Sequence, residues 1–261
     1  SIALASALVA TSVQIAAIPS HVVLAAPGNI TTGVPLGDTN VKDQNVLTFY
    51  KIIANAVAAK NSDVLDYIGS HTAEEVLNQY KEDEKLTSPA MGTDLIRYDG
   101  KIDFGSLKVS SMEGIGWAQN AKEMDLSGIT LATGNDITSI PDKEFQNCSG
   151  LQKIILPQTV TTIGNNAFEG CKKLVTLGIG TAADGVVDLS KVNTIGSNAF
   201  SACEAISDLE LGKYDTRSEL TIKAQAFLGC TALKKIEIPV KNAALIGASA
   251  FENCSGLQEI G

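Results

Sequence analysis

Five cysteines are the residues of this chain best suited to chemistry, because thiols form disulfides, attack electrophiles and bind zinc. All five stand in one recurring phrase, Phe-x-x-Cys, at Phe145/Cys148, Phe168/Cys171, Phe200/Cys203, Phe227/Cys230 and Phe251/Cys254. A repeat of this kind places the thiols in one column, with parallel side chains directed into a shared core. Parallel Cβ vectors are poor geometry for a disulfide, and ligands in one column cannot surround a zinc ion. We therefore expect free, buried cysteines and no metal site.

Other candidates for catalysis are few. Only His71 lies outside the apolar N-terminal segment, beside a predicted helix start with no nucleophile motif nearby. Asp208 and Glu210 alternate along a predicted strand and resemble the paired carboxylates of a glycosidase. An open sheet face offers no pocket to raise the pKa of either group, so a solvated charged face is our interpretation. We expect no enzyme activity and no cofactor.

The cysteines belong to a longer repeat that sets their positions. Apolar residues follow each cysteine in the pattern L-x-x-L-x-L, as in Leu151, Ile154 and Leu156. This pattern predicts the strand of a leucine-rich repeat, in which alternate side chains point into the core. The return limb, such as Ile163 to Cys171, is expected to be a short helix or 3₁₀ turn. A matching isoleucine precedes every phenylalanine, at Ile140, Ile163, Ile195, Ile222 and Ile246.

The positions between the core residues of these strands face outward and line the concave face of the predicted solenoid. Repeat proteins use such extended faces to bind partners. This one is mostly acidic and has no aromatic anchor of the kind that dominates interfaces. It is either a solvated sheet face or a surface for weak, extended or multivalent protein binding. Its members are Glu123, Asp125, Lys153, Ile155, Thr176, Gly178, Asp208, Glu210, Lys235, Glu237 and Glu259.

The phrase LQKIILPQTVTTIGNNAFEGCKKL, Leu151 to Leu174, resembles the BspA-like leucine-rich repeats. The resemblance covers the chain from about residue 137 to the end, and Met112 to Gly128 resembles the general bacterial leucine-rich repeat. It implies an α/β solenoid, a right-handed superhelix of leucine-rich repeats with a small helical N-terminal cap. It also implies a surface protein that adheres to host extracellular-matrix or plasma proteins, or to other bacteria.

Two insertions interrupt the regular spacing, one around TAADGVVDLS and one near KYDTR, and both are expected to be surface loops. The last repeat ends at Gly261 without the polar capping unit that solenoids need for solubility. We therefore expect a fragment truncated at its C-terminus.

The first 26 residues contain no Asp, Glu, Lys or Arg, which is typical of a signal peptide remnant cleaved after Ala25 or Ala26. A membrane anchor and a buried helix are the alternatives, and Pro19 argues against a span of about 30 Å of hydrocarbon. Residues 27–105 are expected to form a linker and the helical cap. An apolar stripe from Val46 to Val57 predicts one helix, which resembles the N-terminal helix of internalin-like solenoids. A capping box at Thr72 and Glu75 predicts the start of another.

The net charge of −9 and the pI of about 4.8 disfavour partners such as nucleic acid and anionic membranes. The sequence therefore predicts a secreted or cell-surface solenoid, from about residue 106 to 261, that mediates protein–protein interaction. Adhesion is the expected role, without membrane insertion of the mature chain. The alternatives are a non-binding spacer that presents a C-terminal module, and the targeting module of a secreted hydrolase.

Overall fold

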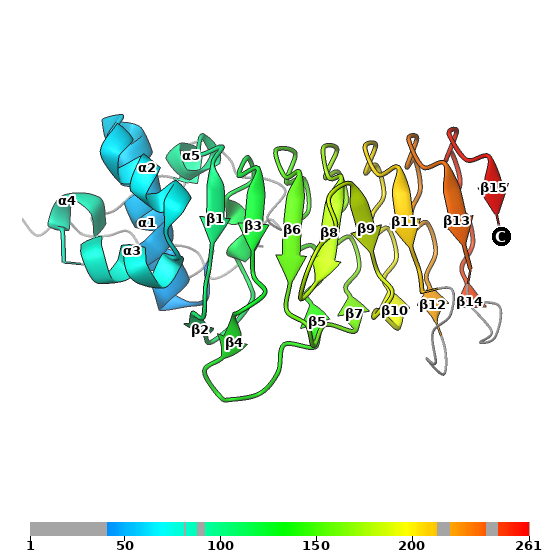
Figure 1. Ribbon diagram of the computed structural model, residues 1–261, viewed down its shortest axis with the longest axis horizontal. Coiled ribbons are helices and arrows are strands. Elements are labelled where there is room, and N and C mark those ends of the chain that lie inside the picture. Colours follow the sequence, from blue (N-terminus) through cyan, green and yellow to red (C-terminus); the bar gives the residue numbers. More distant parts are fainter. Residues whose placement is uncertain (1–40, 81, 88–91, 213–219, 239–244, 261) are drawn as a thin grey trace, which may run out of the picture.

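The computed structural model describes residues 41–80, 82–87, 92–212, 220–238 and 245–260. Helices lie at one end, and the chain then winds through rows of short parallel strands toward the other end (Figure 1). The predicted signal segment, 1–26, and the predicted loop near KYDTR, 213–217, lie outside the described residues. The part that is described is a β-solenoid preceded by a helical unit.

The helical unit begins as the sequence predicts. The Asp43 carboxylate caps the first helix by accepting the N–H groups of Asn45 and Val46, both at 2.9 Å. The predicted capping box is confirmed, because the Glu75 carboxylate accepts the Thr72 N–H at 2.8 Å. The helices are α1 (Gln44–Ala59), α2 (Ser62–Ser70), α3 (Ala73–Tyr80), α4 (Glu84–Thr87) and α5 (Gly92–Ile96).

Helix α1 joins this unit to the solenoid through its apolar face. Phe49 and Tyr50 are fully buried, and the ring centroid of Phe49 lies 5.9 Å from that of Phe104 in an edge-on arrangement. The Tyr50 hydroxyl donates a hydrogen bond to the carbonyl of Ile115, which begins the 3₁₀ turn η1 (Ile115–Trp117).

The strands predicted by L-x-x-L-x-L form one long sheet. All its paired strands run parallel, and register partners such as Ile154 and Leu177 stack in the core. The sheet begins at β1, upstream of the predicted start near Ser106. In sheet order its described strands are β1 (Lys101–Asp103), β3 (Glu123–Asp125), β6 (Lys153–Leu156), β8 (Thr176–Ile179), β9 (Val186–Asp188), β11 (Asp208–Glu210), β13 (Lys235–Glu237) and β15 (Glu259–Ile260).

The isoleucines that precede each phenylalanine form a second parallel sheet, which the sequence did not predict. The return limb is a two-residue strand followed by consecutive turns, not a short helix. The described strands of this sheet are β5 (Ser139–Ile140), β7 (Thr162–Ile163), β10 (Thr194–Ile195), β12 (Thr221–Ile222) and β14 (Leu245–Ile246). Closer to the helices, β2 (Lys108–Val109) pairs with β4 (Thr130–Leu131).

The predicted Phe-x-x-Cys column is confirmed as a ladder in the core. Neighbouring phenylalanine rings stack with centroids 5.1–5.3 Å apart and planes within 10° of parallel. Each cysteine is a buried free thiol whose Sγ donates to a main-chain carbonyl of the preceding repeat, as Cys171 does to Phe145 at 3.0 Å. The thiols therefore join adjacent repeats by weak hydrogen bonds.

One expectation about the insertions is wrong. The insertion TAADGVVDLS is not only a surface loop, because its Val186–Asp188 segment is strand β9 of the long sheet, between β8 and β11. Ile246 matches the isoleucine column but is 45% exposed, since β14 is the last strand of its sheet in the described chain.

Candidate functional site

The predicted binding residues lie on the long sheet, at alternating positions of its strands. Register pairs bring several of them together on neighbouring strands, such as Glu123 beside Lys153 and Asp208 beside Lys235. We call this outward side the sheet face. The structure places its predicted members on β3 (Glu123, Asp125), β6 (Lys153, Ile155), β8 (Thr176), β11 (Asp208, Glu210), β13 (Lys235, Glu237) and β15 (Glu259).

The sheet face is interrupted at β8, where the sequence predicts an open surface. Residues 180–185 cross over the strand, so that Thr176 is 3% exposed and its hydroxyl accepts the Gly185 N–H at 2.9 Å. The carbonyl of Thr181 lies so close to Gly178 that a Cβ there would stand 1.7 Å from its oxygen. Thr176 is therefore unavailable to a partner, and the insertion that buries it is the physical reason.

An ion pair fixes the crossing to the neighbouring strand. The Lys153 ammonium lies 2.6 Å from the Asp184 carboxylate, and this hydrogen bond is the main cause of the raised pKa of Lys153. Asp184 is largely exposed, so the pair contributes about 0–1 kcal/mol to stability. Its main effect is to hold residues 180–185 over β8, where they separate the part of the sheet face on β1 to β6 from the part on β9 to β15.

The half from β9 to β15 is open and mostly acidic. Asp208, Glu210, Lys235 and Glu259 are exposed, and the Lys235 ammonium lies 3.5 Å from the Glu259 carboxylate. Sequence reasoning missed Asp188, which pairs in register with Glu210 and adds a further carboxylate. The signal for this strand was the segment from Val186 to Leu189, in which buried Val187 and Leu189 alternate with the less buried Val186 and Asp188. The irregular length of this repeat concealed it.

The half from β1 to β6 is mixed in charge. Here the prediction missed Lys101 and Asp103, which both lie on β1. The Lys101 ammonium is 3.4 Å from the Asp103 carboxylate. Asp103 and Asp125 also hold the turns after their strands, since they accept the N–H groups of Gly105 and Ser127 at 2.9 Å. These aspartates therefore have a structural role.

The catalytic candidates stay separate in the structure. Asp208 and Glu210 are both exposed on one strand, and His71 stacks on Tyr67 with ring centroids 3.7 Å apart in the helical unit. Among the described residues, no group of three His, Cys, Asp or Glu side chains is placed to hold a metal ion. Within the same residues, no helix has both the length and the apolar character to cross a membrane.

Among the described residues, Glu144 is a carboxyl group with a strongly raised pKa, and it lies away from the sheet face. It precedes Phe145 in a column that otherwise holds alanines: Ala167, Ala199, Ala226 and Ala250. The side chain is 2% exposed and accepts the N–H of Gly116 at 2.9 Å and that of Gly114 at 3.3 Å. Burial raises the pKa of Glu144 to about 8, against the lowering effect of these hydrogen bonds. The residue packs the first Phe-x-x-Cys repeat against η1.

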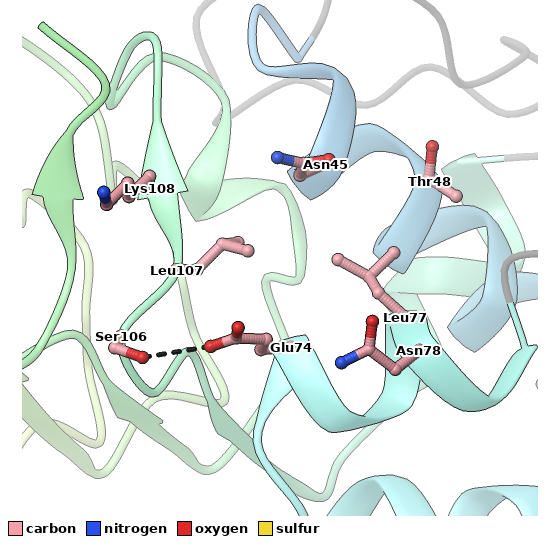
Figure 2. Close-up of a pocket in the computed structure, with 8 residues that line it drawn as sticks. All are labelled: Asn45, Thr48, Glu74, Leu77, Asn78, Ser106, Leu107 and Lys108. Carbon is pink, nitrogen blue, oxygen red and sulfur yellow. Dashed lines mark hydrogen bonds between the residues drawn. The ribbon is translucent and has the colours of Figure 1, made fainter.

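A separate cavity of about 630 Å³ lies in the helical unit beside β2. Leu77 from α3 and Leu107, which precedes Lys108, form its apolar centre (Figure 2). The Ser106 hydroxyl donates to the Glu74 carboxylate at 3.0 Å on one side. Polar side chains complete the rim, from Asn45, Thr48, Asn78 and Lys108.

Comparison with known proteins agrees with the repeat. A family model described as BspA type leucine rich repeat region matches residues 121–258 in six copies. The match begins upstream of residue 137, where the sequence predicts this repeat type to begin, and includes β3. No curated protein matches the chain.

Solved structures provide similar chains. A leucine rich cell surface protein from Faecalibacterium prausnitzii is 25% identical, with 54% of this chain and 36% of that chain covered and a TM-score of 0.38. A leucine-rich repeat protein from Bacteroides ovatus is 27% identical, with 60% and 37% covered and a TM-score of 0.42. An internalin from Listeria monocytogenes is 15% identical, with 75% and 57% covered and a TM-score of 0.31. The chain thus spans little more than a third of the length of the first two proteins.

Proposed function

The chain belongs to the BspA-type leucine-rich repeat family, and we propose that it is a secreted or cell-surface protein that binds another protein through its sheet face. Adhesion to a host extracellular-matrix or plasma protein is the proposed role. We also propose the division predicted from the sequence, with the start of the solenoid moved to β1: a secretion segment at 1–26, a linker and helical cap from 27 to β1, and the solenoid from β1 to 261.

The observation that supports this proposal is the open half of the sheet face from β9 to β15. Parallel strands present Asp208, Glu210, Lys235 and Glu259 side by side, all exposed and directed away from the core. A rigid backbone holds these charges, because the side chains between them pack into the core. A partner can therefore bind them without the cost of ordering a loop.

The crossing at 180–185 shapes the surface offered to a partner. It covers β8 and stands beside Lys153, so a flat protein surface meets either half of the sheet face rather than its whole length. The half beyond β8 carries more carboxylates than ammonium groups. We propose that it binds a basic protein surface, with charge complementarity increasing the rate of association.

The helical unit supports a capping role at the other end. Helix α2 contacts β1, and Thr72 forms a parallel bridge with Asp103 at the edge of the long sheet. In repeat proteins a distinct terminal unit covers the exposed end of the core. We propose that this is the function of α1–α5.

The test is binding of the purified chain to immobilised fibronectin, fibrinogen, laminin and collagen, measured by surface plasmon resonance. The proposal predicts saturable binding to at least one of them that weakens about tenfold or more in the double variant Asp208→Lys, Glu210→Lys. A matched control reverses two exposed carboxylates elsewhere, with Glu82→Lys and Glu252→Lys. Lack of binding to all four proteins contradicts the adhesion role, and equal loss in both double variants contradicts the assignment to the sheet face.

A further inference from the structure

We propose that the cavity between α1, α3 and β2 binds an extended peptide segment of a partner protein, which pairs with the free edge of β2. This site lies in the helical unit, away from the open half of the sheet face (Figure 1). It therefore adds a second binding surface to the proposed function. Its volume of about 630 Å³ is in the range of pockets that hold small ligands or a few residues.

The free edge of β2 follows from its hydrogen bonds with β4. The Thr130 N–H donates to the carbonyl of Leu107 at 3.3 Å, and the Ala132 N–H donates to that of Val109 at 2.8 Å. Alternate residues of a strand direct their main-chain groups to opposite sides. The N–H and carbonyl of Lys108, between these two residues, therefore point away from β4. Within the described residues, no protein group pairs with them. The free edge is confined to Lys108, because the Ser110 N–H, the next donor on the same side of β2, donates to the Asp43 carboxylate at 2.7 Å.

An unpaired strand edge is a template for a further strand, and peptides are commonly recognised by adding one. On most protein surfaces such an edge faces only water. Here it borders the cavity, whose other walls are the first turns of α1 and α3. A peptide paired with Lys108 would thus have its side chains directed onto a shaped surface.

The centre of the cavity selects an aliphatic side chain. Leu77 and Leu107 approach the hollow from opposite walls (Figure 2) and are 8% and 6% exposed. Because both leucines are already largely buried, most of the apolar surface removed from water belongs to the aliphatic side chain itself, at about 25 cal/mol per Å² buried.

The rim selects the flanking residues of the peptide. The Glu74 carboxylate and the Lys108 ammonium lie on different sides of Leu107 (Figure 2). No ion pair engages either group within the described chain. A peptide with a basic residue on one side of its aliphatic residue and an acidic residue on the other can pair the basic residue with Glu74 and the acidic residue with Lys108. The amides of Asn45 and Asn78 add donors and acceptors suited to a peptide backbone.

The experiment uses two fluorescein-labelled peptides, Lys-Thr-Leu-Thr-Glu and the reversed Glu-Thr-Leu-Thr-Lys, which cover both strand directions. The period of a strand places the two charged residues and the leucine on one face. Binding to the full chain is measured by fluorescence polarisation up to about 1 mM chain. We expect saturable binding of one peptide, and about tenfold or more weaker binding when its leucine is replaced by serine or its three central residues are N-methylated.

Variants of the chain test each contact. Glu74→Arg should weaken binding about tenfold or more, and Lys108→Pro should do the same because it removes an N–H that β4 does not use. Glu252→Arg is the matched control, because it reverses an exposed carboxylate at the far end of the solenoid. Circular dichroism of each variant separates lost binding from lost folding. Absence of saturable binding by both peptides overturns the proposal, as does binding that Glu74→Arg and the N-methylated peptide leave unchanged.

Discussion

The Glu144 carboxylate accepts the Gly116 N–H at 2.9 Å in a fully buried environment, and this contact joins the first Phe-x-x-Cys repeat to the unit before it. Gly116 cannot be replaced without displacing this repeat, since a Cβ there would lie 1.8 Å from the Glu144 carbonyl oxygen. The Tyr50 hydroxyl contacts η1 as well, through Ile115. The junction between helical unit and solenoid therefore depends on a buried ionisable group.

Stability should fall with rising pH because of Glu144. Its pKa is about 8 in the folded chain, raised from 4.5 chiefly by burial. Between these two values the folded state keeps a proton that the unfolded state releases, so the free energy of unfolding decreases as pH rises through this window. The decrease is at most on the order of 5 kcal/mol.

Urea unfolding between about pH 5 and pH 8 measures this dependence. Glu144→Gln keeps the shape of the side chain but cannot ionise, so its free energy of unfolding should depend less on pH. Glu252→Gln, which changes an exposed carboxylate, should retain the pH dependence of the parent chain. Parallel curves for the parent and Glu144→Gln would show that Glu144 does not titrate in this range.

The phenylalanine ladder should dominate the stability of the solenoid. Phe168 stacks between Phe145 and Phe200 at 5.1 Å on both sides and is fully buried. Phe168→Ala should cost about 3–5 kcal/mol because it leaves a cavity within the ladder. Lys235→Ala removes an exposed ion-pair partner and should cost no more than about 1 kcal/mol. Thermal unfolding that gives equal melting temperatures for the two variants contradicts the register of the repeat.

The regular part of this fold could be predicted from the sequence because each repeat places the same residue types at the same buried positions. Phe168 and Cys171 occupy buried positions that any copy of the phrase must fill, so their column alone identifies the core. The second sheet was harder to predict, since a two-residue strand such as Thr162–Ile163 has no periodicity of its own. It forms only because neighbouring copies align.

The irregular part could not be predicted, because it depends on contacts between segments of unlike sequence. Thr176 stands at an outward position by the alternation of its strand, yet the crossing at 180–185 buries it. The local sequence does not indicate that residues 180–185 fold back over β8. Glu144 did carry a signal, as the one charged residue in a column of alanines, but only the structure shows that η1 supplies its donors.

The crossing over β8 should depend on glycine at position 178. A Cβ at Gly178 would lie 1.7 Å from the Thr181 carbonyl oxygen, so Gly178→Ala must displace the crossing or the strand. We expect a cost of roughly 1–3 kcal/mol, typical of overpacking. Gly69→Ala is the matched control in helix α2, where no atom lies within 4 Å of the added Cβ. That change should stabilise the chain by about 0.5–1 kcal/mol.

Denaturant unfolding of the two alanine variants gives both free energies, and proteolysis reports the crossing itself. In Gly178→Ala, cleavage by trypsin at Lys191, which donates to the Ile179 carbonyl at 3.1 Å in the parent chain, should become faster than in Gly69→Ala. An unchanged stability for Gly178→Ala would mean that residues 180–185 do not rest on β8.

The thiols should react in an order set by burial and pKa. Cys203 is fully buried, and burial raises its pKa, whereas Cys254 is 9% exposed and the neighbouring Cys230 thiol lowers its pKa. Because the thiolate is the reactive form, a thiol reagent added to the folded chain should modify Cys254 first. Mass spectrometry of peptides after brief labelling identifies the modified residue.

Cys254→Ser should remove this fast reaction, while Cys203→Ser should leave its rate unchanged. After denaturation all five cysteines should react, because each is a free thiol in the folded chain. Fewer than five reactive thiols would reveal a disulfide, which the parallel arrangement of the column disfavours. Early labelling of Cys203 instead of Cys254 would mean that the middle of the solenoid opens more readily than its end.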